Sequence, residues 1–213
     1  SQLKLTADGG GGTVAIKAPA STTGNAAIEL KLPVGNGTNG QALTTNGSGQ
    51  LAFADVGGGK ILQVVQTAKT DTFSTTSTTQ IDIPGFSVNI TPSSTSSKVL
   101  ITGTLVAGLG TTSAYAMRFY MMRGSTAICI HDTAGNRSRC TFGTQGVTQT
   151  DSTISFPFEF LDSPNTTSAT TYKIQAQSEN PQTLYINRSV ETDGDSAISP
   201  RFVSTITATE VAA

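Results

Sequence analysis

The sequence predicts an all-β protein: a Gly-rich N-terminal segment of short strands, followed by an antiparallel β-sandwich of the jelly-roll type, here called the head. The chain has 213 residues, with 22 Gly and no Trp, and is rich in Ser and Thr. Thr favours strands, whereas Ser and Gly favour turns. Apolar and polar residues alternate in runs of strand length. These runs are short up to residue 56 and longer from Lys60 onward.

The N-terminal segment, residues 1–56, contains runs that are each too short to bury a core. The runs stop at Gly or Pro, which break strands, and an Asn-Gly pair predicts a tight hairpin turn. Strands are predicted at residues 3–6, 13–18 and 27–32, with two more within 39–56. Short hairpins expose nearly as much apolar surface as they bury, so wrapping three copies around a common axis would stabilise them. Residues 57–59 are expected to be a Gly hinge.

The head, residues 60–213, is organised around residues 97–124. In residues 99–108 both alternating sets of side chains are partly apolar, which is typical of a strand covered on both faces. Residues 115–122 form the densest apolar and aromatic run, and a turn follows. Further strands are predicted at residues 61–66, 80–83, 86–90, 126–131, 152–161, 171–177, 183–187 and 201–211. This number and spacing fit a two-sheet sandwich, with an edge or a bulge at Pro157.

The densest run carries more apolar side chains than one sandwich face requires. A surplus of this kind can be buried between copies of a symmetric oligomer. We therefore expect a homotrimer whose core, near the threefold axis, is formed by Tyr115, Met117, Phe119 and Met121.

Composition and charge argue against two classes of partner. The chain has 13 Lys and Arg against 14 Asp and Glu, a net charge of −1. Nucleic-acid binding needs a clear excess of positive charge, so no nucleic-acid partner is expected. No apolar run is long enough to span a bilayer, and no signal-peptide pattern is present, so no membrane insertion is expected.

No catalytic, cofactor or metal site is expected. Residues 35–40 match G-x-G-x-x-G, but no strand-to-helix transition follows, so they are interpreted as a turn. His131 is the only His, and no G-x-S-x-G elbow supplies a nucleophile beside it. Glu191, Asp193 and Asp195 could form a calcium loop, although a solvated acidic turn is the favoured interpretation.

Two arginines and two cysteines remain as candidates. Arg137 and Arg139 lie in a polar loop and could contact a carboxylate-bearing glycan, although an exposed or intersubunit ion pair is favoured. Cys129 and Cys140 could face each other across a hairpin. Without a secretion signal, two free thiols are the favoured interpretation.

The N-terminal segment resembles those of small fibre and appendage proteins of tailed bacteriophages, particularly marine ones. The resemblance is carried by the phrases KLTADGGGGTVAIKAPASTTGNAAIELKLP and GQALTTNGSGQLAFADV. The head resembles phage head and fibre-tip domains and, more loosely, the trimeric heads of complement and tumour-necrosis-factor-like proteins. That resemblance is carried by KILQVV, SSKVLITGTLVAG, YAMRFYMMRG–TAICIHD and ISFPFEFLD. It implies a trimer with the N-terminal segment as stalk or anchor.

The resulting hypothesis is a non-enzymatic virion structural protein of a tailed phage, made in the host cytoplasm. In this hypothesis residues 1–56 attach a trimeric fibre or appendage to other virion proteins, and the head contacts the host surface, for example a glycan. The alternative is a capsid decoration or cement protein that stabilises the shell. A carbohydrate-active enzyme is less favoured, because the 14 acidic residues lie mostly in turns rather than as a pair.

Overall fold

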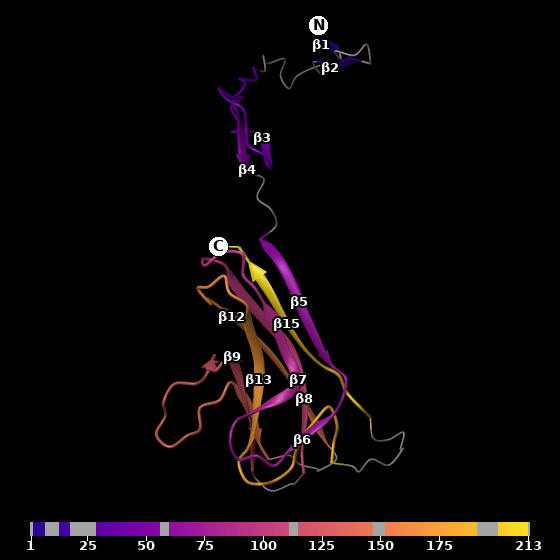
Figure 1. Cartoon of the computed structure of the whole chain (residues 1–213), viewed down its shortest axis with the longest axis vertical. Helices are drawn as coiled ribbons and strands as arrows, with labels where there is room; N and C mark the ends of the chain where they lie inside the picture. Colours follow the sequence, from indigo (N-terminus) through magenta and orange to yellow (C-terminus); the bar gives the residue numbers. More distant parts are fainter. Residues whose placement is uncertain are drawn as a thin grey trace. The chain divides into compact units, whose positions relative to one another are not determined.

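The computed structural model describes residues 2–6, 13–17, 29–55, 60–110, 115–146, 152–190 and 200–212 (Figure 1). The chain divides into two compact units, Ser1–Gly58 and Gly59–Ala213. Every regular element among the described residues is a β-strand. The predicted hinge at residues 57–59 lies outside the described residues.

The described strands of the first unit form two antiparallel pairs, β1 (Gln2–Thr6) with β2 (Thr13–Lys17) and β3 (Gln41–Thr45) with β4 (Leu51–Asp55). The Asn46 side chain accepts hydrogen bonds from the backbone of Ser48 and Gln50 at 2.9 and 3.3 Å, which confirms the predicted Asn-Gly turn between β3 and β4. The strand predicted at 27–32 is reduced to one parallel bridge between Lys31 and Gln50, and residues 27 and 28 are not described.

The second unit, the head, is a sandwich of two antiparallel sheets. The first, which we call the β8 sheet, contains β5 (Ile61–Lys69), β6 (Phe73–Thr75), β8 (Lys98–Leu109), β12 (Thr153–Asp162), β14 (Leu184–Ile186) and β15 (Ser204–Val211). The second, the β9 sheet, contains β7 (Ile81–Ile90), β9 (Ala116–Arg123), β10 (Thr126–Ile128), β11 (Phe142–Gln145) and β13 (Thr170–Ser178). The first and last strands of the head are neighbours, and the C-terminus lies beside the start of β5 (Figure 1), where the Ala212 amide donates to the Lys60 carbonyl at 2.7 Å.

β8 is the central strand of its sheet. It pairs with β12 on one side and with β15 and β14 on the other. Val99, Ile101 and Leu105 are fully buried on its inner face. Its outer face is covered only in the second half, where a Cβ on Gly108 would lie 3.1 Å from the Arg188 carbonyl. The predicted burial on both faces is therefore confirmed for the inner face and for half of the outer one.

The long strands β7, β8, β9, β12 and β13 alternate between the two sheets, so the chain passes from one sheet to the other between successive long strands. Aromatic rings fill the space between the layers: Phe142 stacks on Phe119 at 5.3 Å and on Phe158 at 5.6 Å between ring centroids. The Phe158 ring packs against Gly103 of β8. A Cβ added at this position would lie only 2.5 Å from the ring, so a larger residue would clash with it. The predicted all-β jelly-roll sandwich is confirmed.

Several local predictions differ in detail. The two strands predicted around residues 84 and 85 are one strand, β7, which bulges there: Ser87 pairs with Lys173 and Asp82 pairs with Gln175. Gly85 takes a positive φ of 70° at this bulge, a conformation that Gly adopts without strain. Strands β6 and β11 were not predicted. Pro157 is exposed on β12, which pairs only with β8 among the described strands, so the predicted edge is confirmed.

An ion pair with a buried carboxylate joins the two sheets at one end. The Arg123 guanidinium of β9 donates to both carboxylate oxygens of Asp162 on β12 at 2.9 Å, and the Tyr172 hydroxyl of β13 donates to the same carboxylate at 2.7 Å. Burial and the Asp162 carboxylate raise the pKa of Tyr172 well above its usual value. The hydroxyl therefore remains a donor, and the carboxylate is fully paired in the interior.

A second buried carboxylate holds the loop before β8. Glu210 of β15 is fully buried, and it accepts hydrogen bonds from the backbone and hydroxyl of Ser93, each 2.7 Å, and from the Gln63 amide at 2.6 Å. Burial by itself raises the pKa of Glu210, but the hydrogen bonds from Gln63 and Ser93 outweigh it and lower the pKa to about 2. The carboxylate is therefore ionised at neutral pH.

Candidate functional site

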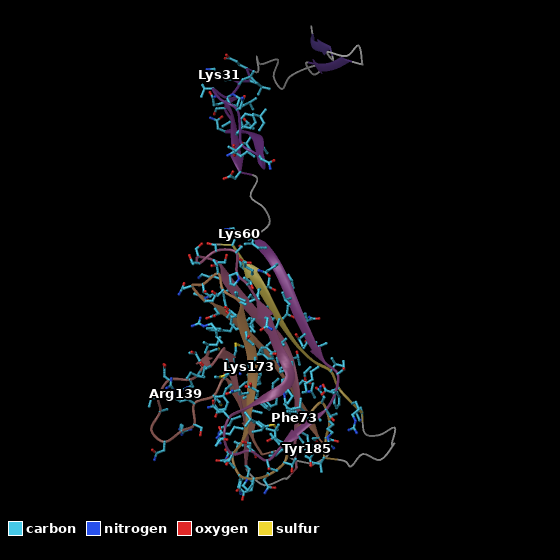
Figure 2. The ribbon with its side chains drawn as sticks, viewed as in Figure 1. Lys31, Lys60, Phe73, Arg139, Lys173 and Tyr185 are labelled. Carbon is cyan, nitrogen blue, oxygen red and sulfur yellow. The ribbon has the colours of Figure 1, made fainter. Side chains whose placement is uncertain are left out.

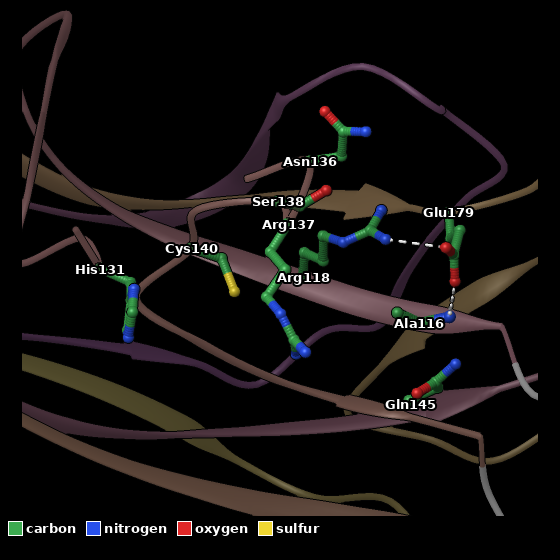
Figure 3. Close-up of a pocket in the computed structure, with 9 residues that line it drawn as sticks. All are labelled: Ala116, Arg118, His131, Asn136, Arg137, Ser138, Cys140, Gln145 and Glu179. Carbon is green, nitrogen blue, oxygen red and sulfur yellow. Dashed lines mark hydrogen bonds and ion pairs between the residues drawn. The ribbon is translucent and has the colours of Figure 1, made fainter. Parts of the chain in front are cut away.

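A pocket of about 550 Å³ opens on the outer face of the β9 sheet (Figure 3). Its walls come from the first residues of β9, the end of β11, the residue after β13 and the loop 129–141 that connects β10 to β11. The lining residues are Ala116, Arg118, His131, Asn136, Arg137, Ser138, Cys140, Gln145 and Glu179. Most of these side chains are polar, and three of them can carry a positive charge.

Strand alternation directs Arg118 into this pocket. Its neighbours Met117 and Phe119 point into the core, so Arg118 points outward. Its guanidinium pairs with Glu179 at 3.0 Å. The other oxygen of Glu179 accepts the Ala116 amide at 2.7 Å, and the Glu179 amide donates to the Ala116 carbonyl at 2.9 Å. One wall of the pocket is therefore held together across β9 and β13.

The opposite wall is the loop 129–141, which is anchored on β9. The Thr141 amide donates to the Phe119 carbonyl at 2.9 Å, and the Thr141 hydroxyl accepts the Met121 amide at 2.8 Å. The loop turns at Gly135, where φ is 58° and the Arg137 amide donates to the Ala134 carbonyl at 3.2 Å. This turn directs Arg137 into the pocket.

The structure gives the two predicted loop arginines different surroundings. Arg139 lies on the same loop (Figure 2) but is not among the residues that line the pocket. Its Nε donates to the His131 carbonyl at 2.5 Å, a bond that stabilises the loop. Arg137 lines the pocket. In Figure 3 the Arg118 guanidinium points to Glu179, whereas that of Arg137 is turned elsewhere. Among the described side chains, none is bonded to the Arg137 guanidinium.

Both cysteines are free thiols. Burial raises the pKa of the Cys129 thiol and, although Arg118 lowers it in part, also that of the Cys140 thiol. Both thiols are therefore protonated at neutral pH, and Cys140 is a poor nucleophile despite lining the pocket.

The four residues predicted to form a trimer core do not lie where that prediction needs them. Met117, Phe119 and Met121 are fully buried within the sandwich of a single chain, and Tyr115 is half-buried against the same core. The prediction is corrected: a second sheet, together with the unpredicted strand β11, already covers these side chains. The three fully buried side chains, Met117, Phe119 and Met121, therefore cannot also contact another copy.

The remaining sequence candidates are His131, residues 35–40 and the acidic residues of the possible calcium loop. His131 is exposed, and its Nδ1 lies 2.7 Å from the Asp132 carbonyl. Residues 35–40 form an exposed loop and turn before β3. Glu191, Asp193 and Asp195 lie outside the described residues. In the described part of the chain, no three His, Cys, Asp or Glu side chains are grouped as metal ligands, and no helix has the length and hydropathy needed to cross a membrane.

Sequence reasoning missed Arg118, Glu179, Asn136 and Ser138. A signal existed for one of them: Arg118 is a charged residue inside the densest apolar run, which indicates an outward-facing position with a specific partner. Glu179 gives no such signal, because it comes next to Arg118 only through the pairing of β13 with β9.

No protein-family model matches the chain. No curated protein matches it either. Among solved structures, the chain is similar to infectious bursal disease virus Gt strain, with a TM-score of 0.38 and 16% identity over 76% of this chain and 40% of that one. It is also similar to the VP2 subviral particle of infectious bursal disease virus, with a TM-score of 0.33 and 15% identity over the same shares. The chain thus corresponds to less than half the length of these proteins.

Proposed function

We propose that this protein is a non-enzymatic structural component of a tailed-phage virion, a homotrimeric fibre or appendage. Residues 1–56 attach it to other virion proteins, and the head projects outward, where its loops contact the host surface. The proposal is supported by the resemblance of the N-terminal segment to those of phage appendage proteins and by the contrast in burial between the two units.

The observation that carries the proposal is the absence of a core among residues 29–55. None of these 27 residues is buried. Large apolar side chains are nevertheless frequent there, and the exposed ones are Leu30, Leu32, Val34, Leu43 and Phe53. A segment of this kind gains order by packing against other chains. An attachment segment has this property.

The outer face of the β8 sheet supports the trimer. Strand register places Val64, Thr209, Leu100 and Leu161 in one row across β5, β15, β8 and β12. Val64 is 59% exposed and Leu161 is 48% exposed. The adjoining row contains Gln66, Thr207, Thr102 and Glu159, and on the described strands of this face only Lys98 and Glu159 are charged. A nearly uncharged surface with exposed apolar side chains suits contact with further copies of the chain.

The size of this face indicates that the N-terminal segment contributes to the contact. The four strands share a length of 8 residues, that of β15. With a rise of about 3.3 Å per residue and a spacing of about 4.8 Å between strands, they form a face of roughly 500 Å². Stable interfaces bury about 800 Å² on each partner. The exposed apolar side chains of residues 29–55 would supply the difference.

Light scattering tests the trimer. We expect the full chain to have three times the 21.9 kDa mass of one chain at micromolar concentration. Val64→Asp combined with Leu161→Asp should shift it towards the monomer without unfolding the head, because both side chains are exposed. Thr126→Asp, on exposed β10, is the matched control and should stay trimeric. A monomeric native chain would contradict the proposal.

Particle incorporation tests the anchor. A chain that begins at Gly57 should fold but fail to join particles that lack the native protein, whereas residues 1–56 fused to an unrelated reporter should join them. If the isolated head joins particles, the head is the docking surface and the decoration function replaces the appendage function.

The copy number of the protein per particle separates the same two functions. A decoration protein requires a copy number that matches the number of shell subunits, whereas an appendage requires far fewer copies.

The pocket on the β9 sheet does not favour a glycoside hydrolase. Such an enzyme needs two carboxyl groups facing the scissile bond. The described lining contains one carboxylate, Glu179, and it is already bonded to Arg118 and to the Ala116 amide.

A further inference from the structure

We propose that the pocket on the β9 sheet binds the carboxylate of an acidic sugar, with Arg137 as the residue that contacts it. The inference rests on the proposed outward position of the head and adds the ligand class and the binding residue. The pocket volume of about 550 Å³ lies within the range of roughly 300–1,000 Å³ that small-molecule sites occupy.

The charges in the pocket leave one guanidinium available. Glu179 neutralises Arg118 and holds it 3.0 Å away against the wall. Arg139 is committed to the His131 carbonyl. Arg137 lines the pocket from an exposed loop, and no described side chain pairs with it. Among the described lining residues, Arg137 therefore carries the one guanidinium that no described carboxylate neutralises.

A guanidinium presents parallel N–H donors that match the two oxygens of a carboxylate, so a singly charged planar anion fits Arg137 better than a bulky or apolar one. The rest of the lining suits hydroxyl groups. Asn136 and Ser138, next to Arg137 on the same loop, offer an amide and a hydroxyl that both donate and accept. The apolar lining is limited to the small side chains Ala116 and Cys140, which is too little for a lipid or an aromatic ligand.

The loop that presents Arg137 is held in place before any ligand arrives. Thr141 fixes one end of it to β9, and the Arg139 bond to the His131 carbonyl closes it across its width. Binding would therefore order few additional residues, which favours affinity for a small polar ligand.

Calorimetry with the full chain tests the inference, using tri-galacturonate as the acidic probe and the matching neutral galactose trisaccharide as its counterpart. We expect the acidic probe to bind and the neutral one to bind at least tenfold more weakly. Arg137→Gln should weaken binding of tri-galacturonate at least tenfold. Lys60→Gln removes the same charge at an exposed residue of the head outside the pocket and should change it less than twofold.

Three results would overturn the inference: no binding of tri-galacturonate, equal binding of both trisaccharides, or undiminished binding by Arg137→Gln. Inorganic sulfate is the further probe, and displacement of tri-galacturonate by equimolar sulfate would identify a general anion site instead. Because Arg137 is exposed, Arg137→Gln should keep the native melting temperature and still join particles. Loss of sugar binding with normal incorporation separates this inference from the proposed anchor, whose failure would appear in incorporation alone.

Discussion

The head and the β3–β4 hairpin both carry phenylalanine on a paired strand, but only the head buries it. Phe119 on β9 is fully buried and stacks on Phe142 from the neighbouring strand β11. Phe53 on β4 is 39% exposed although Leu43 lies opposite it on β3. Both phenylalanines have a cross-strand partner, so pairing is not the difference. The head has a second sheet to cover the first, whereas a two-stranded hairpin cannot bury its own face.

The two units also differ in their buried polar groups. The head encloses Asp162 and Glu210, and each carboxylate is fully hydrogen-bonded. Such groups are tolerated in a protein interior only where they are paired and hydrogen-bonded. Residues 29–55 bury no polar side chain. This contrast predicts that the head is stable by itself and that the hairpin depends on other chains.

The largest expected effect comes from truncating the two phenylalanines in turn. Phe119→Ala should lower the free energy of unfolding of the full chain by about 3–5 kcal/mol, because it leaves a cavity in the core. Phe53→Ala removes the same atoms from an exposed position and should leave the head transition unchanged. Urea denaturation followed by circular dichroism measures both. A similar loss of unfolding free energy in the two variants would contradict the proposed difference in packing between the two units.

The next effect comes from the ion pair that joins the sheets. Asp162→Asn should cost about 2 kcal/mol of stability, since it weakens charged hydrogen bonds to Arg123 and Tyr172 in the interior. Asp82→Asn is the control, because Asp82 pairs with Lys173 at 2.7 Å but is 54% exposed. It should cost less than about 1 kcal/mol. Equal melting temperatures for the two variants would show that burial is not decisive.

A smaller effect concerns acid. The pKa of Glu210 is about 2 in the folded head against 4.5 ordinarily, so the native state favours the ionised form. Its stabilisation is complete above pH 4.5 and is lost as the pH falls towards 2. Glu210→Gln should therefore be less stable than the native chain at neutral pH and lose less stability on acidification. Thermal melts across this window test it, and parallel curves would contradict it.

The smallest effect is expected for the thiols. Replacing Cys129 by Ser and Cys140 by Ala should move the melting temperature by only a few degrees, because the head is held by its core and not by a cross-link. Differential scanning calorimetry of both proteins measures the change. A loss on the order of 2–5 kcal/mol would instead indicate a native disulfide.

Sequence patterns located most strands but not all of their surroundings. The burial of β8, the turn at Asn46 and the edge position of Pro157 follow from local alternation and from backbone chemistry, which the chain carries in short windows. β11 was missed because its four residues are too few to show a period. The bulge of β7 was read as a break between two strands, because Pro84 and Gly85 usually end a strand.

The sequence by itself determined most of the strand content, the position of the long apolar strands and the lack of a core among residues 29–55, because each depends on the order of nearby residues. Only the tertiary structure decided which layer covers Met117, Phe119 and Met121, that Glu179 pairs with Arg118 from the next strand of the sheet, and that Arg137 rather than Arg139 lines the pocket. Alternation predicts which residues of a strand share the apolar face. It does not show what lies opposite, since that partner comes from strands distant in sequence.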